Sequence, residues 1–209
     1  MELSAIRHPE YLHIHSGEEL FFGANQEWYD KLWQRRAGCG PTAASMAMSY
    51  LLQKQAAVNG TDRKPLTDRN GFTELMNEVW HYVTPGYRGV NSTSIYIRGC
   101  REYAKQHNLD IDIRYLNVLG DRKLRPSAEE ISAFIQKSLQ DDCPVAFLNL
   151  HNGDEKNLDR WHWVLLVSFD AGSGEAVMYD QGLSTDINIY LWLNTTVFGG
   201  GFVTIDSIG

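Results

Sequence analysis

Cys39 lies in a local sequence that suits a nucleophile. The stretch GCGPT (38–42) places its thiol at the predicted start of a helix, with Pro41 in the first turn, where a missing N–H costs nothing. A helix N-terminus carries partial positive charge and unpaired N–H groups, and both favour a thiolate, the form that attacks an acyl carbon. The flanking Gly38 and Gly40 are expected to leave room for the substrate backbone.

A histidine and an aspartate further along the chain are candidates for the base and its orienting acid. His162 begins an apolar run and stands between Trp161 and Trp163, which we expect to shield it and to contact the substrate. A neutral imidazole there can accept the thiol proton and return it to the leaving group. Asp180 ends the next predicted strand, so a hairpin of the two strands would bring its carboxylate beside His162.

Gln34 precedes Cys39 by five residues and is a candidate for stabilising the oxyanion. Its side-chain amide and the Cys39 backbone N–H would form a pair of donors aimed at charge that develops only in the transition state. The alternative interpretation of Gln34 is a solvated residue at the end of a helix. Asp180 likewise has the alternative of a simple turn residue, since aspartate suits turns.

The chain's other two cysteines, Cys100 and Cys143, are predicted to be inert, buried residues. Three cysteines that are widely spaced and lack a CxxC pair form neither a disulfide framework nor a typical metal site. Free thiols in a reducing compartment are the interpretation that this spacing favours.

The N-terminal segment contains a pattern that could bind a metal. Alternation along a strand would place His13 and His15 on one face, and Glu19 would supply a carboxylate. The flanking glycines expected of such a motif are missing, and no partner motif follows. We therefore predict no metal and no cofactor, and interpret the segment as an exposed edge or lid near the cleft.

The hydrophobic periodicity predicts helices in the first part of the chain and strands in the second. The predicted helices cover 39–53, 72–83 and 92–107, the last with Ser92 or Asn91 as its cap. A fourth begins at the capping box Ser127–Glu130 and continues through Leu139. The predicted strands are 110–118, 144–150, 162–169, 175–179, 187–193 and 202–205.

This order predicts an α+β fold with a mostly antiparallel sheet. We expect one domain over 1–209, with a helical part over about 1–140 and a β part over about 141–209. The small side chains after Cys39 predict that its helix is enclosed and packs against that sheet.

Charge and hydropathy narrow the classes of partner. The net charge of -7 across 209 residues gives no broad basic field, so we expect no nucleic-acid partner. No apolar run reaches the length of a membrane span, and the first residues lack the basic-then-apolar order of a signal peptide. We predict a soluble cytoplasmic protein with no membrane partner, whose oligomeric state the sequence leaves open.

The order of these motifs resembles the papain-like cysteine peptidase superfamily. Gln34, Cys39-Gly-Pro at a helix start, His162-Trp-Val at a strand start, and Tyr179-Asp180 follow that superfamily's sequence of parts. The chain looks most similar to the bacterial branch that includes leader-peptide-processing peptidases of bacteriocin exporters. The resemblance runs over about 34–182, although the papain motif CGSCW is absent.

The resemblance implies a papain-like fold with nucleophile Cys39, base His162, orienting acid Asp180 and oxyanion residue Gln34. It also implies thiol-dependent cleavage of a peptide, isopeptide or related amide through an acyl-enzyme. The same residues would serve an acyltransferase, and a catalytically silent binding module remains the alternative from another class.

Substrate specificity is expected to come from the segments that match no known motif, 1–33 and 55–125. Arg35-Arg36 is interpreted as a solvated pair, with recognition of an acidic substrate group as the alternative. The tryptophans are predicted to form core or cleft wall, a few of them as substrate subsites: Trp28, Trp33, Trp80, Trp161, Trp163 and Trp192.

Overall fold

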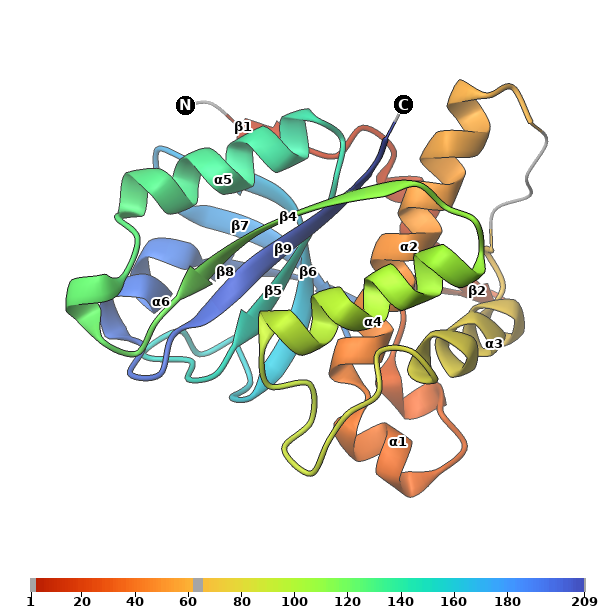
Figure 1. The fold of residues 1–209 in the computed structure, drawn as a ribbon, viewed down its shortest axis with the longest axis horizontal. Helices are drawn as coiled ribbons and strands as arrows, with labels where there is room; N and C mark the ends of the chain where they lie inside the picture. Colours follow the sequence, from red (N-terminus) through yellow and green to blue (C-terminus); the bar gives the residue numbers. More distant parts are fainter. Residues whose placement is uncertain (1–2, 62–65, 209) are drawn as a thin grey trace.

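The fold, seen in a computed structural model that describes residues 3–61 and 66–208, is α+β with one large antiparallel sheet (Figure 1). Within those residues seven strands pair in the order β4-β9-β5-β6-β7-β8, and β1 pairs with the end of β6 that lies beyond its contact with β5. The strands are β1 (Leu3–Ala5), β4 (Ile111–Val118), β5 (Val145–Asn149), β6 (His162–Asp170), β7 (Glu175–Asp180), β8 (Leu183–Asn188) and β9 (Gly200–Ser207).

Helices cover both faces of the central strands. Every residue of β5 is buried, and successive side chains of a strand point to opposite faces, so neither face of β5 meets solvent. On one face Trp163 of β6 stacks on Tyr96 of α4 (Thr93–Gln106). On the other face Trp192 of α6 (Ile189–Thr195) packs edge-on against Phe147.

The helix that begins at Cys39 is long and central. This helix, α2, spans Cys39–Val58, so it continues beyond the predicted end at residue 53. It contacts β5, β6 and β9 of the sheet. The small residues Ala43, Ala44 and Ala47 are at most 5% exposed, which confirms the prediction that this helix is enclosed.

Three further helices begin at side-chain caps. Ser92 accepts a hydrogen bond from the Ile95 backbone at the start of α4, as predicted. The predicted capping box is present at the start of α5 (Ala128–Gln140). The third, α3 (Arg69–Trp80), begins about one turn before the predicted residue 72, because Asp68 caps it by accepting from the Gly71 N–H.

The predicted strand over 187–193 is wrong. The chain leaves β8 at Asn188 and forms the helix α6, and the Asn188 side chain caps it by accepting a hydrogen bond from the Leu191 N–H at 2.9 Å. The buried residues Ile189, Trp192 and Leu193 have helical spacing. Their β-forming side chains gave the misleading signal, and the local cap together with the packing of Trp192 decided the outcome.

The sheet takes strands from both parts of the chain. The sheet contains β1 and β4, which precede residue 141, together with strands that follow that residue. The helix α5 also precedes residue 141. The N-terminal segment forms further elements that were not predicted. They are the hairpin of β2 (His13–Ser16) and β3 (Glu19–Phe22), the helix α1 (Leu32–Ala37), and 3-10 turns at Pro9–Leu12 and Gln26–Trp28. Another unpredicted 3-10 turn, Arg122–Leu124, lies in the middle of the chain.

Across residues 3–61 and 66–208, no helix combines the length and the apolar character that crossing a bilayer requires.

The capping box gives a stability prediction that is separate from the site. Ser127→Ala removes the acceptor of the Glu130 N–H, so we expect the free energy of unfolding to fall by about 1 kcal/mol. Urea titration followed by circular dichroism measures the change. Thr73→Ala, which leaves every helix cap intact, is the control, and equal losses in both variants would contradict the assignment of the cap.

Candidate active site around Cys39

Cys39 is the first residue of α2. The short helix α1 ends at Ala37, and Gly38 (φ -83°, ψ -6°) joins the two helices, with no side chain capping the start of α2. Positive potential at this helix end therefore acts on a half-buried thiol that faces a pocket. The predicted placement of Cys39 at a helix start is confirmed.

The pairing of β6 with β7 brings His162 and Asp180 together. Leu165 pairs with Tyr179, so the next pair along places Asp180 opposite Val164, on the same face as His162. The His162 Nε2 lies 2.8 Å from Asp180 Oδ1, and the histidine is 6% exposed. The hairpin inferred from the sequence therefore forms, and the carboxylate fixes the orientation of the imidazole.

Cys39 interacts with the same imidazole. Burial by itself lowers the pKa of His162, but hydrogen bonds with Asp180 and Cys39, together with the charges of both, raise that pKa to about 10. Because Asp180 occupies Nε2, the other ring nitrogen, Nδ1, is the one left for the Cys39 sulfur. A protonated imidazole beside a sulfur at a helix N-terminus favours the thiolate and holds a proton ready for transfer.

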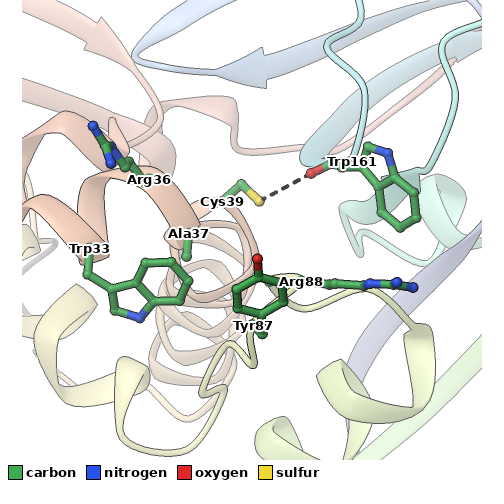
Figure 2. A pocket seen from close by; sticks show the side chains of 8 residues that line it. Trp33, Arg36, Ala37, Cys39, Tyr87, Arg88 and Trp161 are labelled. Carbon is green, nitrogen blue, oxygen red and sulfur yellow. Dashed lines mark hydrogen bonds between the residues drawn. The ribbon is translucent and has the colours of Figure 1, made fainter.

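Strained backbone flanks both ends of this arrangement. Trp161, just before His162, has φ 57°, and Gln181, just after Asp180, has φ 51°, both in a region that non-glycine residues rarely adopt. The Trp161 carbonyl oxygen points at Cys39 and lies 4.0 Å from its sulfur (Figure 2). Such outliers recur at functional sites, where the surrounding structure must hold them in place.

The N-terminal segment holds the backbone that follows Asp180. The Phe22 N–H donates to the Gly182 carbonyl at 2.8 Å, and the Gly182 N–H donates to the Ala24 carbonyl at 3.2 Å. The Asn25 side chain donates to the Gln181 carbonyl at 2.9 Å. Part of the segment 1–33, expected to carry specificity, therefore braces the turn after the candidate orienting acid.

Gln34 lies beneath the pocket wall. It is 8% exposed, so the alternative of a solvated helix-end residue is wrong. Its side-chain nitrogen donates to Asn77 Oδ1 of α3 at 3.2 Å, while its α1 neighbours Trp33, Arg36 and Ala37 line the pocket. One of the two hydrogens of the Gln34 amide is thus bonded to Asn77. The sequence gave no sign that Asn77 would be its partner.

Three residues expected to contact substrate instead serve packing. A side chain at Gly38 would meet the Tyr29 ring at 2.7 Å, and one at Gly40 would meet Val90 at 2.7 Å, so neighbouring protein fills the space expected for substrate. Trp163 is 2% exposed, and its indole N–H donates to the Val90 carbonyl at 2.6 Å. Trp163 is therefore a core residue that does not line the pocket.

The pocket beside Cys39 has a volume of about 490 Å³. Aromatic residues and arginines make up most of its wall, and Figure 2 shows them around the sulfur: Trp33, Tyr87 and Trp161, with Arg36 and Arg88. Trp161 is 48% exposed, as a residue facing substrate should be. Trp161 and Trp33 thus line the cleft, which is one of the two places predicted for the tryptophans.

Sequence reasoning missed the loop that carries Tyr87 and Arg88. Gly86 and Gly89 exchange two backbone hydrogen bonds, of 3.2 and 2.9 Å, and so close a two-residue turn with these side chains at its tip. Gly89 has φ 69°, which a glycine adopts without strain. The two glycines around two large side chains were the signal that would have marked this turn.

The remaining sequence candidates lie away from this chemistry. The His13 ring packs edge-on against Phe22 at 5.1 Å, and residues 3–61 and 66–208 contain no group of three or more potential ligands able to hold a metal ion. Cys100 and Cys143 are at most 1% exposed, as predicted, and burial raises the pKa of both thiols.

Comparisons with known proteins add little. No protein-family model matches the chain, and no curated protein matches it. Among solved structures it is similar to xylellain, a cysteine protease from Xylella fastidiosa, with 12% identity over 82% of this chain and 80% of that one and a TM-score of 0.38.

The raised pKa of His162 predicts how stability depends on pH. A group whose pKa is higher in the folded state stabilises the fold fully below its unfolded pKa, and this contribution is lost as pH rises through the folded value. Between its ordinary value of 6.5 and about 10, the stability conferred by His162 should therefore decline.

We expect the difference in unfolding free energy between the wild type and His162→Gln to be larger near pH ~6 than near pH ~10. Urea titrations at both pH values measure it. A difference that grows with pH would mean that the imidazole is neutral in the folded protein.

Proposed function

We propose that this protein is a thiol-dependent hydrolase of papain-like fold that cleaves a peptide, isopeptide or related amide bond. The observation that carries the proposal is the position of His162, whose Nε2 bonds to Asp180 while its ring also interacts with the Cys39 sulfur at the helix N-terminus. This geometry supplies a nucleophile, a proton carrier and an orienting carboxylate, each in contact with the next.

In the proposed reaction the Cys39 thiolate attacks the carbonyl carbon of the amide and forms a tetrahedral oxyanion. His162 gives its proton to the leaving amine as the C–N bond breaks, which leaves an acyl-enzyme. His162 then takes a proton from water, whose oxygen attacks the thioester and releases the acid and the Cys39 sulfur. We assign oxyanion stabilisation to the Cys39 N–H and to the amide hydrogen of Gln34 that Asn77 leaves available.

Selective alkylation tests the nucleophile. Iodoacetamide should modify Cys39 much faster than Cys100 or Cys143, because those two thiols are buried and protonated while Cys39 faces the pocket. Peptide mapping by mass spectrometry gives the rate at each site, and labelling in urea is the control that exposes all three. Equal, slow rates in the folded protein would leave the silent binding module as the better interpretation.

His162→Ala removes the imidazole, so fast labelling of Cys39 should be lost while circular dichroism stays that of the wild type. Tyr115→Ala, at an exposed β4 position, is the matched control that should label like the wild type. Unchanged Cys39 reactivity in His162→Ala would show that the imidazole does not activate the thiol.

Asp180→Asn keeps the shape of the side chain but removes the charge that helps raise the pKa of His162. Near neutral pH, labelling of Cys39 should slow, because the imidazole proposed to activate the thiol then holds its proton less firmly. The pH profile of labelling should shift as well, and a merely structural role for Asp180 would leave that profile in place.

A further inference from the structure

We propose that the cleft selects an amide substrate with a carboxylate on the leaving-group side, bound by Arg88, and a large apolar side chain on the acyl side, received by Trp33 and Tyr87. This specificity rests on the proposed function and names the class of substrate for the same site. It comes from how the pocket wall is arranged around the reacting sulfur.

The position of His162 decides which side of Cys39 holds the leaving group. The acyl carbon bonds to sulfur, whereas the leaving amine must receive the proton of His162 and so lies on the imidazole side. His162 follows Trp161, whose carbonyl oxygen lies 4.0 Å from the Cys39 sulfur, so we take the imidazole side to be the side on which Figure 2 shows Trp161. Trp33 and Ala37 lie on the opposite side, which is therefore the acyl side.

Arg88 extends toward the leaving-group side. Figure 2 shows its side chain running from beside Tyr87 toward the Trp161 side of the pocket, whereas the guanidinium of Arg36 points away from Cys39. Among the described residues, no carboxylate forms an ion pair with Arg88, and the wall of the pocket contains no aspartate or glutamate. A guanidinium beside the cleft of a chain with net charge -7 is suited to a carboxylate on the substrate.

The loop that presents Arg88 is held by the core. The Gly86–Gly89 turn continues into Val90, which packs on Gly40 of α2 and accepts the Trp163 indole N–H at 2.6 Å. A fixed loop loses less conformational entropy when it binds substrate, so a charge at its tip gives more selectivity than one on a mobile segment.

The acyl side presents exposed aromatic surface. Trp33 is 49% exposed, and Tyr87, whose ring lies between Trp33 and Arg88 in Figure 2, is 96% exposed. Large aromatic side chains that stand open to water at a concave site gain from covering by an apolar group. A large apolar side chain covers more of these two rings than a small one, so we expect the cleft to favour it.

The test uses peptides blocked at both ends, with phenylalanine on the acyl side of one bond and either glutamate or glutamine after it. A second pair ends just after the bond in one alanine, with either a free or an amidated carboxyl group. The two pairs separate a side-chain carboxylate from a terminal one. Mass spectrometry of the products gives each rate, and replacing phenylalanine by glycine tests the acyl side.

We expect the wild type to cleave at least one carboxylate peptide about fivefold faster than its neutral partner, the size of one partly exposed charge interaction. Arg88→Gln should remove this preference, and Arg88→Glu should reverse it toward a lysine at the same place. Arg98→Gln on α4 removes an equal charge away from the pocket and should keep it. No preference in the wild type, or one that persists in Arg88→Gln, overturns the inference.

A pair of alkylating agents tests the same point without turnover. Iodoacetate and iodoacetamide differ by one negative charge, so their rate ratio at Cys39 reports attraction of a carboxylate. Arg88→Gln should lower this ratio about fivefold and leave the iodoacetamide rate unchanged. An unchanged ratio with fast iodoacetamide labelling overturns this specificity alone, whereas slow labelling of Cys39 by both agents overturns the proposed function as well.

Discussion

The arrangement around Cys39 depends on the register between β6 and β7. This register places Asp180 diagonally across from His162 on one face of the sheet, at hydrogen-bond distance. A slip of one residue would turn Asp180 to the opposite face and leave a buried imidazole without its carboxylate. Strand β6 is buried along most of its length and pairs on its other edge with the fully buried β5, so the core of the sheet and the geometry of the site are set by the same pairing.

Contacts made by residues outside the pocket hold the site in place. The N-terminal segment bonds to Gln181 and Gly182 and so holds the strained turn that follows Asp180. Gly40 and Trp163 hold Val90, and through it the turn that carries Tyr87 and Arg88. Residues that need not touch substrate thereby decide where the residues that line the pocket lie, which is how a large core can fix a small cleft.

The cleft concentrates positive potential in a chain that is acidic as a whole. The N-terminus of α2, a His162 that holds its proton at neutral pH, and the guanidinium of Arg88 gather near one sulfur. Such a local field stabilises a thiolate and a developing oxyanion, and clefts of one sign also attract substrates of the other. The net charge of -7 gave no sign of this local field, because it averages over the whole surface.

The sequence by itself determined the features that local signals govern. Proline and small side chains fixed the helix start at Cys39, caps fixed α4 and α5, and apolar runs fixed the strands that carry His162 and Asp180. Only the tertiary structure decided which side chains face the cleft. Val90 packs on Gly40 and accepts the Trp163 indole N–H, and Arg88 reaches the pocket, through contacts between segments far apart in the chain. Such contacts leave no periodic trace in either segment, because each side chain's direction depends on what packs against it.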